Sequence, residues 1–173
     1  MKRILFAAAL LAASAVPATA QPGPPASGSV ASTRAVYETV KGYLLAAAEQ
    51  MPEADYAFKP VATVRSFGEI VAHVAQAQHM ICGAALGEGR MQPGPAPATK
   101  AAIIADLRAS FEHCDRAYSQ SDADAGAMGQ LFGQPRSRIG ILVLNTSHDF
   151  EHYGNLVTYM RIKGLVPPSS QGG

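Results

Sequence analysis

The sequence predicts an all-α protein, a four-helix bundle in one domain, and three observations support this. Apolar residues recur at steps of three and four residues in four separate segments. Capping residues, glycines and prolines bound these segments. Tryptophan is absent and alanine is abundant, a composition that favours closely packed helices over a sheet. Four helices in a single domain of this length form a bundle.

The first segment, residues 1–20, is expected to be a signal peptide. Two basic residues precede an apolar run, and Ala18-Thr19-Ala20 forms a small-residue cleavage site before Gln21. Residues 21–29, rich in proline and small residues, are expected to be a flexible leader. We therefore expect an exported protein, periplasmic or secreted. The bundle should occupy residues 30–168, followed by a disordered tail over residues 169–173.

The charge of the mature chain excludes one class of partner. Removal of Lys2 and Arg3 leaves 12 basic residues against 13 acidic ones, so there is no electrostatic case for nucleic acid. Gln21 rather than cysteine follows the cleavage site, which argues against a lipid anchor. No later apolar run is long enough to span a bilayer, so no membrane anchor is expected. We expect a small-molecule partner and leave a homodimer open.

The first two helices are predicted from their apolar stripes and end signals. Residues 32–50 form the first helix, which Pro52 stops. Ser66-Phe67-Gly68-Glu69 is a capping box, and the second helix runs from it to about Leu86. The inward residues are expected to be Val36, Val40, Tyr43, Leu44 and Ala47 in the first helix, and Phe67, Ile70, Val74, Ala77 and Ile81 in the second.

The last two helices follow an irregular crossover over Gly87–Ala98. Thr99 caps the third helix, which ends before residues 119–122, and its stripe comprises Ile103, Leu107, Ser110, Phe111, Cys114, Ala117 and Tyr118. Pro135 suits the first turn of the last helix, which continues to about Lys163, with Gly164 as its C-terminal cap.

Three histidines are candidate metal ligands. His148 and His152 lie four residues apart, which puts both imidazoles on one helix face, and apolar neighbours show that this face points inward. His73 lies on the inward stripe of the second helix. Three converging imidazoles suit Zn²⁺, Ni²⁺ or Fe²⁺ with one position open. The alternative is that they are hydrogen-bonded core histidines. His79 and His113 are expected on the surface, because they point away from the inward stripes.

Four polar residues could surround this site. Asp149 and Glu151 lie about 80° to either side of the histidine pair and could accept ring N–H groups, or could be solvent-facing acids. Glu69 serves the helix cap first. Asn155 lies closer to the site face and is the preferred polar pocket residue.

The chain resembles the DinB family of four-helix metal proteins. The resemblance covers nearly all of the mature chain and is strongest over Ser66–Ala75 and His148–Pro168. It implies that His73, His148 and His152 bind a divalent metal ion. It also implies an up-down-down-up topology, in which the second and third helices are parallel and joined by the long crossover. The family's commoner last motif has a basic residue and glutamine where this chain has Tyr153 and Asn155, which bears on the substrate pocket.

A disulfide between Cys82 and Cys114 fits this topology. Two cysteines in an exported chain suggest a bridge. Parallel helices would bring the two residues level, whereas antiparallel helices would offset them by about 16 Å. Two unpaired buried thiols are the alternative.

The expected function is that of an exported divalent-metal-binding protein with an open His₃ site. A metal-dependent transferase or hydrolase of unknown substrate is one interpretation, since characterised members of the family it resembles include thiol transferases. A non-catalytic bundle, in which the ion only joins two helices, is the other. A structural ion would call for a fourth protein ligand, and the sequence offers no obvious one.

Overall fold

The structure is a computed structural model that describes residues 28–89, 94 and 97–171. Four long helices form the bundle: α1 (Ser29–Gln50), α2 (Phe67–Leu86), α3 (Lys100–Ala117) and α5 (Arg138–Ile162). Shorter elements are η1 (Glu53–Asp55), α4 (Asp122–Gly126), β1 (Met128–Leu131), β2 (Gln134–Ser137) and η2 (Pro168–Ser170). The expected signal peptide (1–20), residues 21–27 of the leader and part of the crossover lie outside the described residues.

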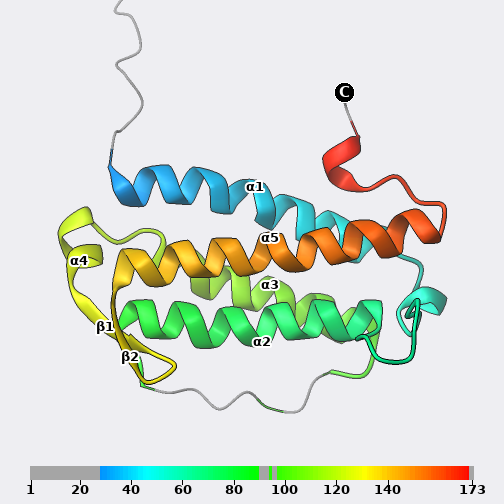
Figure 1. Ribbon diagram of the computed structural model, residues 1–173, viewed down its shortest axis with the longest axis horizontal. Helices are drawn as coiled ribbons and strands as arrows, with labels where there is room; N and C mark the ends of the chain where they lie inside the picture. The colour runs from blue at the N-terminus through cyan, green and yellow to red at the C-terminus, as the bar shows by residue number, and fades with distance from the viewer. Residues whose placement is uncertain (1–27, 90–93, 95–96, 172–173) are drawn as a thin grey trace, which may run out of the picture.

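The helices run up, down, down and up, as expected. Side-chain contacts pair Gln78 with Ser110 and Cys82 with Cys114, so α2 and α3 are parallel. Arg65 lies just before the start of α2, and its carbonyl accepts from the hydroxyl of Tyr159 near the end of α5. The end of α5 therefore lies beside the start of α2, so these two helices are antiparallel. Figure 1 shows α2 ending near the β-hairpin and α3 starting at the far end of the bundle. The long crossover is what permits two consecutive helices to be parallel.

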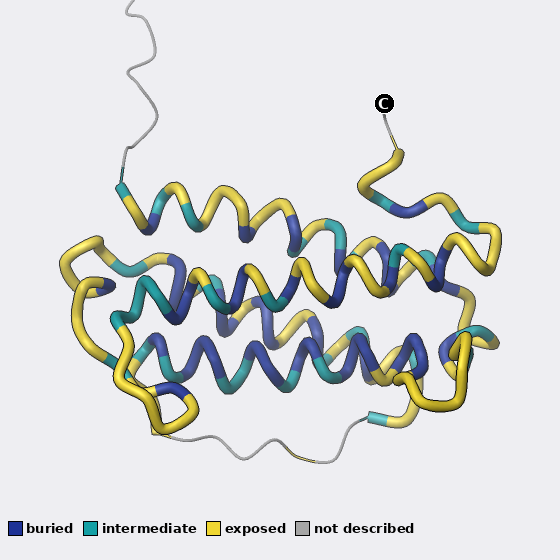
Figure 2. The backbone as a smooth tube through the Cα atoms, viewed as in Figure 1, coloured by how far each residue is buried: buried dark blue, intermediate teal, exposed yellow. Residues whose placement is uncertain are grey.

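The core lies where the four helices meet, and α2 is the most buried helix (Figure 2). All predicted inward residues of α2 and α3 are buried. In α1 the prediction is wrong at Val36, which is 49% exposed, whereas Tyr37 is fully buried. The Tyr37 ring stacks on Tyr118 with centroids 3.9 Å apart, and its hydroxyl donates to Asp115. The inward stripe predicted for this helix did not include Tyr37.

The segment before the last helix differs from the prediction. Pro135 lies in β2 rather than in the first turn of α5, and it pairs with Gln130 of β1 in a two-stranded antiparallel hairpin. The turn consists of Phe132 and Gly133, with φ of 54° and 74°. Positive φ at both positions is the requirement of a type I′ turn, which asparagine-glycine usually signals. Because phenylalanine rather than asparagine occupies the first position, the turn was not predicted from the sequence. Helix α5 starts three residues later, where Ser137 caps it through the amide of Gly140.

The two ends of the domain extend beyond the expected limits. Ser29 already belongs to α1, so the leader stops earlier than expected. Ser169 and Ser170 lie in η2 instead of a disordered tail, because the Tyr153 hydroxyl holds Ser169 through its amide and side chain. Gly164, with φ of 75°, follows α5 as its left-handed cap. Among the described helices none is both long and apolar enough to cross a bilayer.

Candidate metal centre

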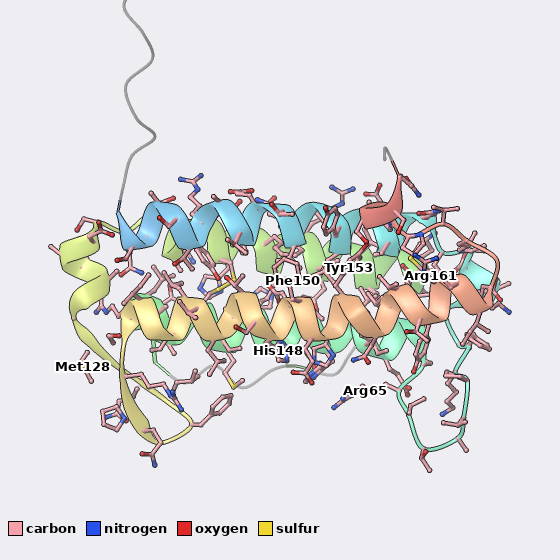
Figure 3. The ribbon with its side chains drawn as sticks, turned by 45° about the horizontal axis from the view of Figure 1, so that its top comes forward. Arg65, Met128, His148, Phe150, Tyr153 and Arg161 are labelled. Atoms are coloured by element: carbon pink, nitrogen blue, oxygen red, sulfur yellow. A yellow bond between two sulfur atoms is a disulfide. The ribbon has the colours of Figure 1, made fainter. Side chains whose placement is uncertain are left out.

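The ends of α2 and α5 determine where the candidate ligands stand. The predicted capping box is present: the Ser66 hydroxyl accepts from the Glu69 amide, and the Glu69 carboxylate accepts from the Ser66 amide at 2.6 Å. His73 lies about two turns into α2. Since α5 is antiparallel to α2, its middle turns pass beside His73 and carry His152 and His148, of which His148 is labelled in Figure 3.

The three predicted histidines come together. The Nε2 atom of His148 lies 3.3 Å from Nε2 of His73 and 3.1 Å from Nε2 of His152. All three ligand atoms lie within 4.8 Å of one another. Nitrogen ligands about 2.0–2.1 Å from a tetrahedral zinc ion are separated by about 3.3–3.4 Å. The three side chains could therefore hold one divalent ion. Within the described residues no fourth His, Cys, Asp or Glu joins the group.

The surroundings of the triad favour neutral imidazoles, the form that binds metals. Burial, followed by the neighbouring rings of His152 and His73, lowers the pKa of His148 to about 4. Burial also lowers the pKa of His73, with Arg65 as the next cause, and lowers the pKa of His152. At neutral pH each ring therefore offers a lone pair.

The second nitrogens of the triad are not tied to protein acceptors. Nδ1 of His148 and Nδ1 of His152 are buried, and neither has a hydrogen-bond partner among the described residues. The expected ring acceptors do not reach them, because Asp149 points elsewhere and Glu151 is solvent-exposed. The rings are held by packing between α2 and α5 rather than by carboxylates.

Asp149 belongs to a buried polar network that sequence analysis missed. Its carboxylate is fully buried and accepts from Gln78 Nε2 and Asn145 Nδ2, both at 3.2 Å. Burial raises the pKa of this carboxyl to about 7, an effect that the hydrogen bond from Gln78 opposes. The network continues to Tyr118, whose hydroxyl lies 3.3 Å from Asn145. An acid flanking a helix face can turn into the bundle when another helix supplies donors, and only the packed helices reveal this.

A pocket of about 920 Å³ opens beside the triad. His73 and His152 line it, as does Asn155, the residue expected there from the sequence. Two cationic side chains, Lys59 and Arg65, lie on its rim, with Glu69 as the acidic one. The remaining polar side chains in its lining are Thr63, Gln76 and Tyr159. A small molecule in this pocket would therefore meet both imidazole rings and positively charged side chains.

The two remaining histidines and the cysteines lie on the opposite side of α2. Cys82 and Cys114 form a disulfide between α2 and α3, with Cα atoms 5.1 Å apart. His79 is partly exposed. His113 was expected on the surface, but it is buried, and its ring lies beside Gly83 of α2. Neither joins the triad.

Known proteins and structures resemble this chain. A family model described as the DinB superfamily matches residues 37–156. A DinB-like protein from Bacillus cereus superposes with a TM-score of 0.68 at 18% identity, covering 79% of this chain and 93% of its own. A DinB-like protein from Bacillus subtilis gives a TM-score of 0.64 at 18% identity, covering 82% of this chain and 99% of its own. No curated protein sequence matches the chain. At this identity the structural likeness is one of fold.

Proposed function

The chain belongs to the DinB superfamily, and on that premise we propose that it is an exported protein that binds one divalent metal ion through His73, His148 and His152. The observation that carries the proposal is the convergence of three Nε2 atoms within 4.8 Å. Burial that keeps the rings neutral supports it, since protonated imidazoles would repel a cation.

The proposed centre keeps a position open for a substrate. Three protein ligands next to a pocket are typical of catalytic sites, whereas structural sites enclose the ion with four. A divalent ion there would act as a Lewis acid that lowers the pKa of a coordinated water or thiol. Zinc, nickel and iron(II) all suit imidazole ligands. We propose a metal-dependent transferase or hydrolase acting on a small molecule.

The residues around the pocket divide the work of binding such a molecule. Lys59 and Arg65 supply positive charge at the rim, which favours a substrate with an anionic group. The Asn155 amide offers both a donor and an acceptor near His152. Glu69 is engaged by the amide of Ser66, and these hydrogen bonds lower the pKa of its carboxyl. It therefore serves the helix end and is a poor proton acceptor.

A structural role for the ion is the rival function. An ion that only fastens α2 to α5 would stabilise the fold without turning over any substrate. The 920 Å³ pocket beside His73 and His152 favours the catalytic interpretation, because a purely structural ion needs no access. Export is supported by the disulfide, which persists in oxidising compartments. Amino-terminal sequencing of the exported protein should find Gln21 first.

Elemental analysis of tag-free protein tests the central claim. We expect about one tightly bound divalent ion per chain in the wild type. The variant carrying both His148→Ala and His152→Ala should lose this ion. Its loss of metal affinity should exceed the roughly 10- to 100-fold loss that follows removal of a residue that only hydrogen-bonds to a ligand. Asn155→Ala, which changes the pocket but no ligand, is the matched control and should retain the ion. Full occupancy in the double variant would overturn the proposal.

A further inference from the structure

A second histidine pair joins α2 to α3 on the side of α2 away from the triad. Nδ1 of His79 lies 3.4 Å from Nδ1 of His113, and the ring planes are tilted by 31°. His113 is 7% exposed and the His79 side chain 25%, so the pair is half enclosed. The two residues are 34 positions apart in the sequence, and no local pattern connects them.

Each ring of this pair has a carboxylate at its other nitrogen. Nε2 of His113 lies 2.8 Å from the Glu88 carboxylate, and Nε2 of His79 lies 3.5 Å from the Asp106 carboxylate. An ionised carboxylate can only accept hydrogen bonds. The 2.8 Å contact with Glu88 holds hydrogen on Nε2 of His113, and the nearby Asp106 carboxylate favours the same tautomer of His79. In neutral rings of this tautomer each Nδ1 carries a lone pair. The two lone pairs face each other.

Two facing lone pairs repel unless a cation lies between them. A shared proton would draw the nitrogens to the 2.7–3.2 Å of an ordinary hydrogen bond. A tetrahedral metal ion would hold them about 3.3–3.4 Å apart. The observed 3.4 Å agrees with the second value and exceeds the first; the corresponding distances in the triad are 3.3 Å and 3.1 Å. Carboxylates that orient imidazoles through the distal nitrogen are the usual outer partners of metal-binding histidines.

We propose that His79 and His113 form a second metal site, which takes a zinc-like divalent ion through their Nδ1 atoms. Glu88 and Asp106 are positioning residues that orient the rings, and their negative charges favour a cation. Arg116, 3.5 Å from Glu88, offsets part of that charge. In the described part of the chain no third His, Cys, Asp or Glu completes this group. The site is therefore weaker than the triad and exchanges its ion with solvent.

The surrounding fold holds this site in place before an ion arrives. The disulfide between Cys82 and the neighbour of His113, Cys114, fixes the spacing of α2 and α3 at this level. Gly83 lies against the pair: a Cβ there would stand 3.5 Å from the His113 ring and 3.4 Å from Glu88. Preorganisation of this kind lowers the entropy lost on binding.

Zinc titration in the absence of the triad tests the site. Tag-free, oxidised protein carrying His148→Ala and His152→Ala is titrated with ZnCl₂ by calorimetry, with thermal unfolding as a check on folding. We expect one weaker zinc ion per chain. Adding His79→Gln, at the more exposed ring, should weaken binding at least 10-fold, and Glu88→Gln about 10-fold. Glu112→Gln, an exposed acid beside His113, is the matched control and should leave binding unchanged.

The coordinating atoms are tested separately by ¹⁵N NMR of the imidazoles. Zinc should shift the Nδ1 resonances of His79 and His113 and leave hydrogen on Nε2. Absence of zinc binding in the triad-free protein, or Nδ1 resonances that do not move while zinc binds, would overturn the proposal. If the two rings share a proton instead of binding a metal ion, zinc should either fail to bind or leave the Nδ1 resonances unmoved. Failure of the triad to bind metal would show instead in the wild type, and would leave this titration unaffected.

Discussion

The two faces of α2 carry histidine clusters that are built in opposite ways. On the α5 face, three Nε2 atoms converge beside an open pocket, and the buried Nδ1 atoms of His148 and His152 lack partners among the described residues. On the α3 face, two Nδ1 atoms converge, carboxylates hold the outer nitrogens, and a disulfide fastens the helices. The first cluster has three candidate ligand atoms, but few contacts that orient its rings. The second has two candidate ligand atoms, and carboxylates and a disulfide hold its rings and helices.

This difference shows that number of ligands and rigidity of ligands are separate properties of a metal site. In the proposed triad site the affinity would come from three ligands, since Nδ1 of His148 and Nδ1 of His152 have no hydrogen-bond partner among the described residues to orient the rings. The His79–His113 pair has only two candidate ligands, so its proposed affinity depends on preorganisation of the rings.

At neutral pH, the largest loss of stability from a substitution should come from breaking the disulfide. Cys82 and Cys114 are separated by 32 residues, and the loop-entropy model gives about 3–4 kcal/mol for a loop of that length. The Cys82→Ser, Cys114→Ser variant should lose that much free energy of unfolding, measured by urea denaturation. Zinc affinity of the α3 face should fall, and that of the triad should not. Equal loss at both faces would show that the disulfide supports the bundle as a whole.

Metal binding at the triad should give the next largest change. An ion present at 100 times its dissociation constant stabilises the folded state by about 2.7 kcal/mol. Denaturation with and without zinc should show this gain in the wild type, and the His148→Ala, His152→Ala variant should not show it at the same zinc concentration. His79→Gln, which alters only the α3 face, should keep nearly all of it. If His79→Gln removed the gain instead, the α3 face would be the stronger site.

The α5 face should also show a pH dependence that comes from Asp149. Burial raises the pKa of its carboxyl from 3.8 to about 7, so between these values the folded protein binds more protons than the unfolded chain. The contribution of Asp149 to the stability of the metal-free protein should therefore fall as pH rises from about 4 to 7. Relative to Asp149→Asn the fall is at most about 1.4 kcal/mol per pH unit.

The lowered pKa values of His73, His148 and His152 act in the other direction, but they are common to both proteins and cancel in their difference. Urea denaturation of both proteins in EDTA, at several pH values, measures the difference in their free energies of unfolding, which reports the ionisation of Asp149. A constant difference from pH 4 to 7 would mean that Asp149 ionises normally and that its burial is relieved by solvent. Zinc affinity of the α3 face should not change in the Asp149→Asn variant.

The smallest effect concerns the hydroxyl that ends the buried network. The Tyr118 hydroxyl lies 2.8 Å from the Leu142 carbonyl and 2.7 Å from Thr146 Oγ1. Tyr118→Phe should lower the free energy of unfolding by about 1 kcal/mol, the usual net value of such a hydrogen bond. Tyr43→Phe, a hydroxyl removed from α1, is the control. A larger loss for Tyr118→Phe would mean that the network acts cooperatively.

Much of the α5 face was predictable from the sequence, whereas little of the α3 face was. His148 and His152 share a helix turn, so their spacing alone indicated a common direction. His73 was placed with them by its inward stripe and by family resemblance. His79 and His113 gave no such signal, because nothing in either helix states which residue of the other lies opposite. Asp149 was ambiguous for the same reason.

What the sequence determined by itself is local: the limits of α2 and α3, the capping box, the inward stripes of α2 and α3, and the paired histidines on α5. These follow from a helical repeat that each segment carries alone. The tertiary structure decided the hairpin at Phe132 and Gly133, the inward turn of Asp149, and the meeting of His79 with His113. Those depend on the register between helices and on partners far away in the chain, and only the packed bundle brings them into contact.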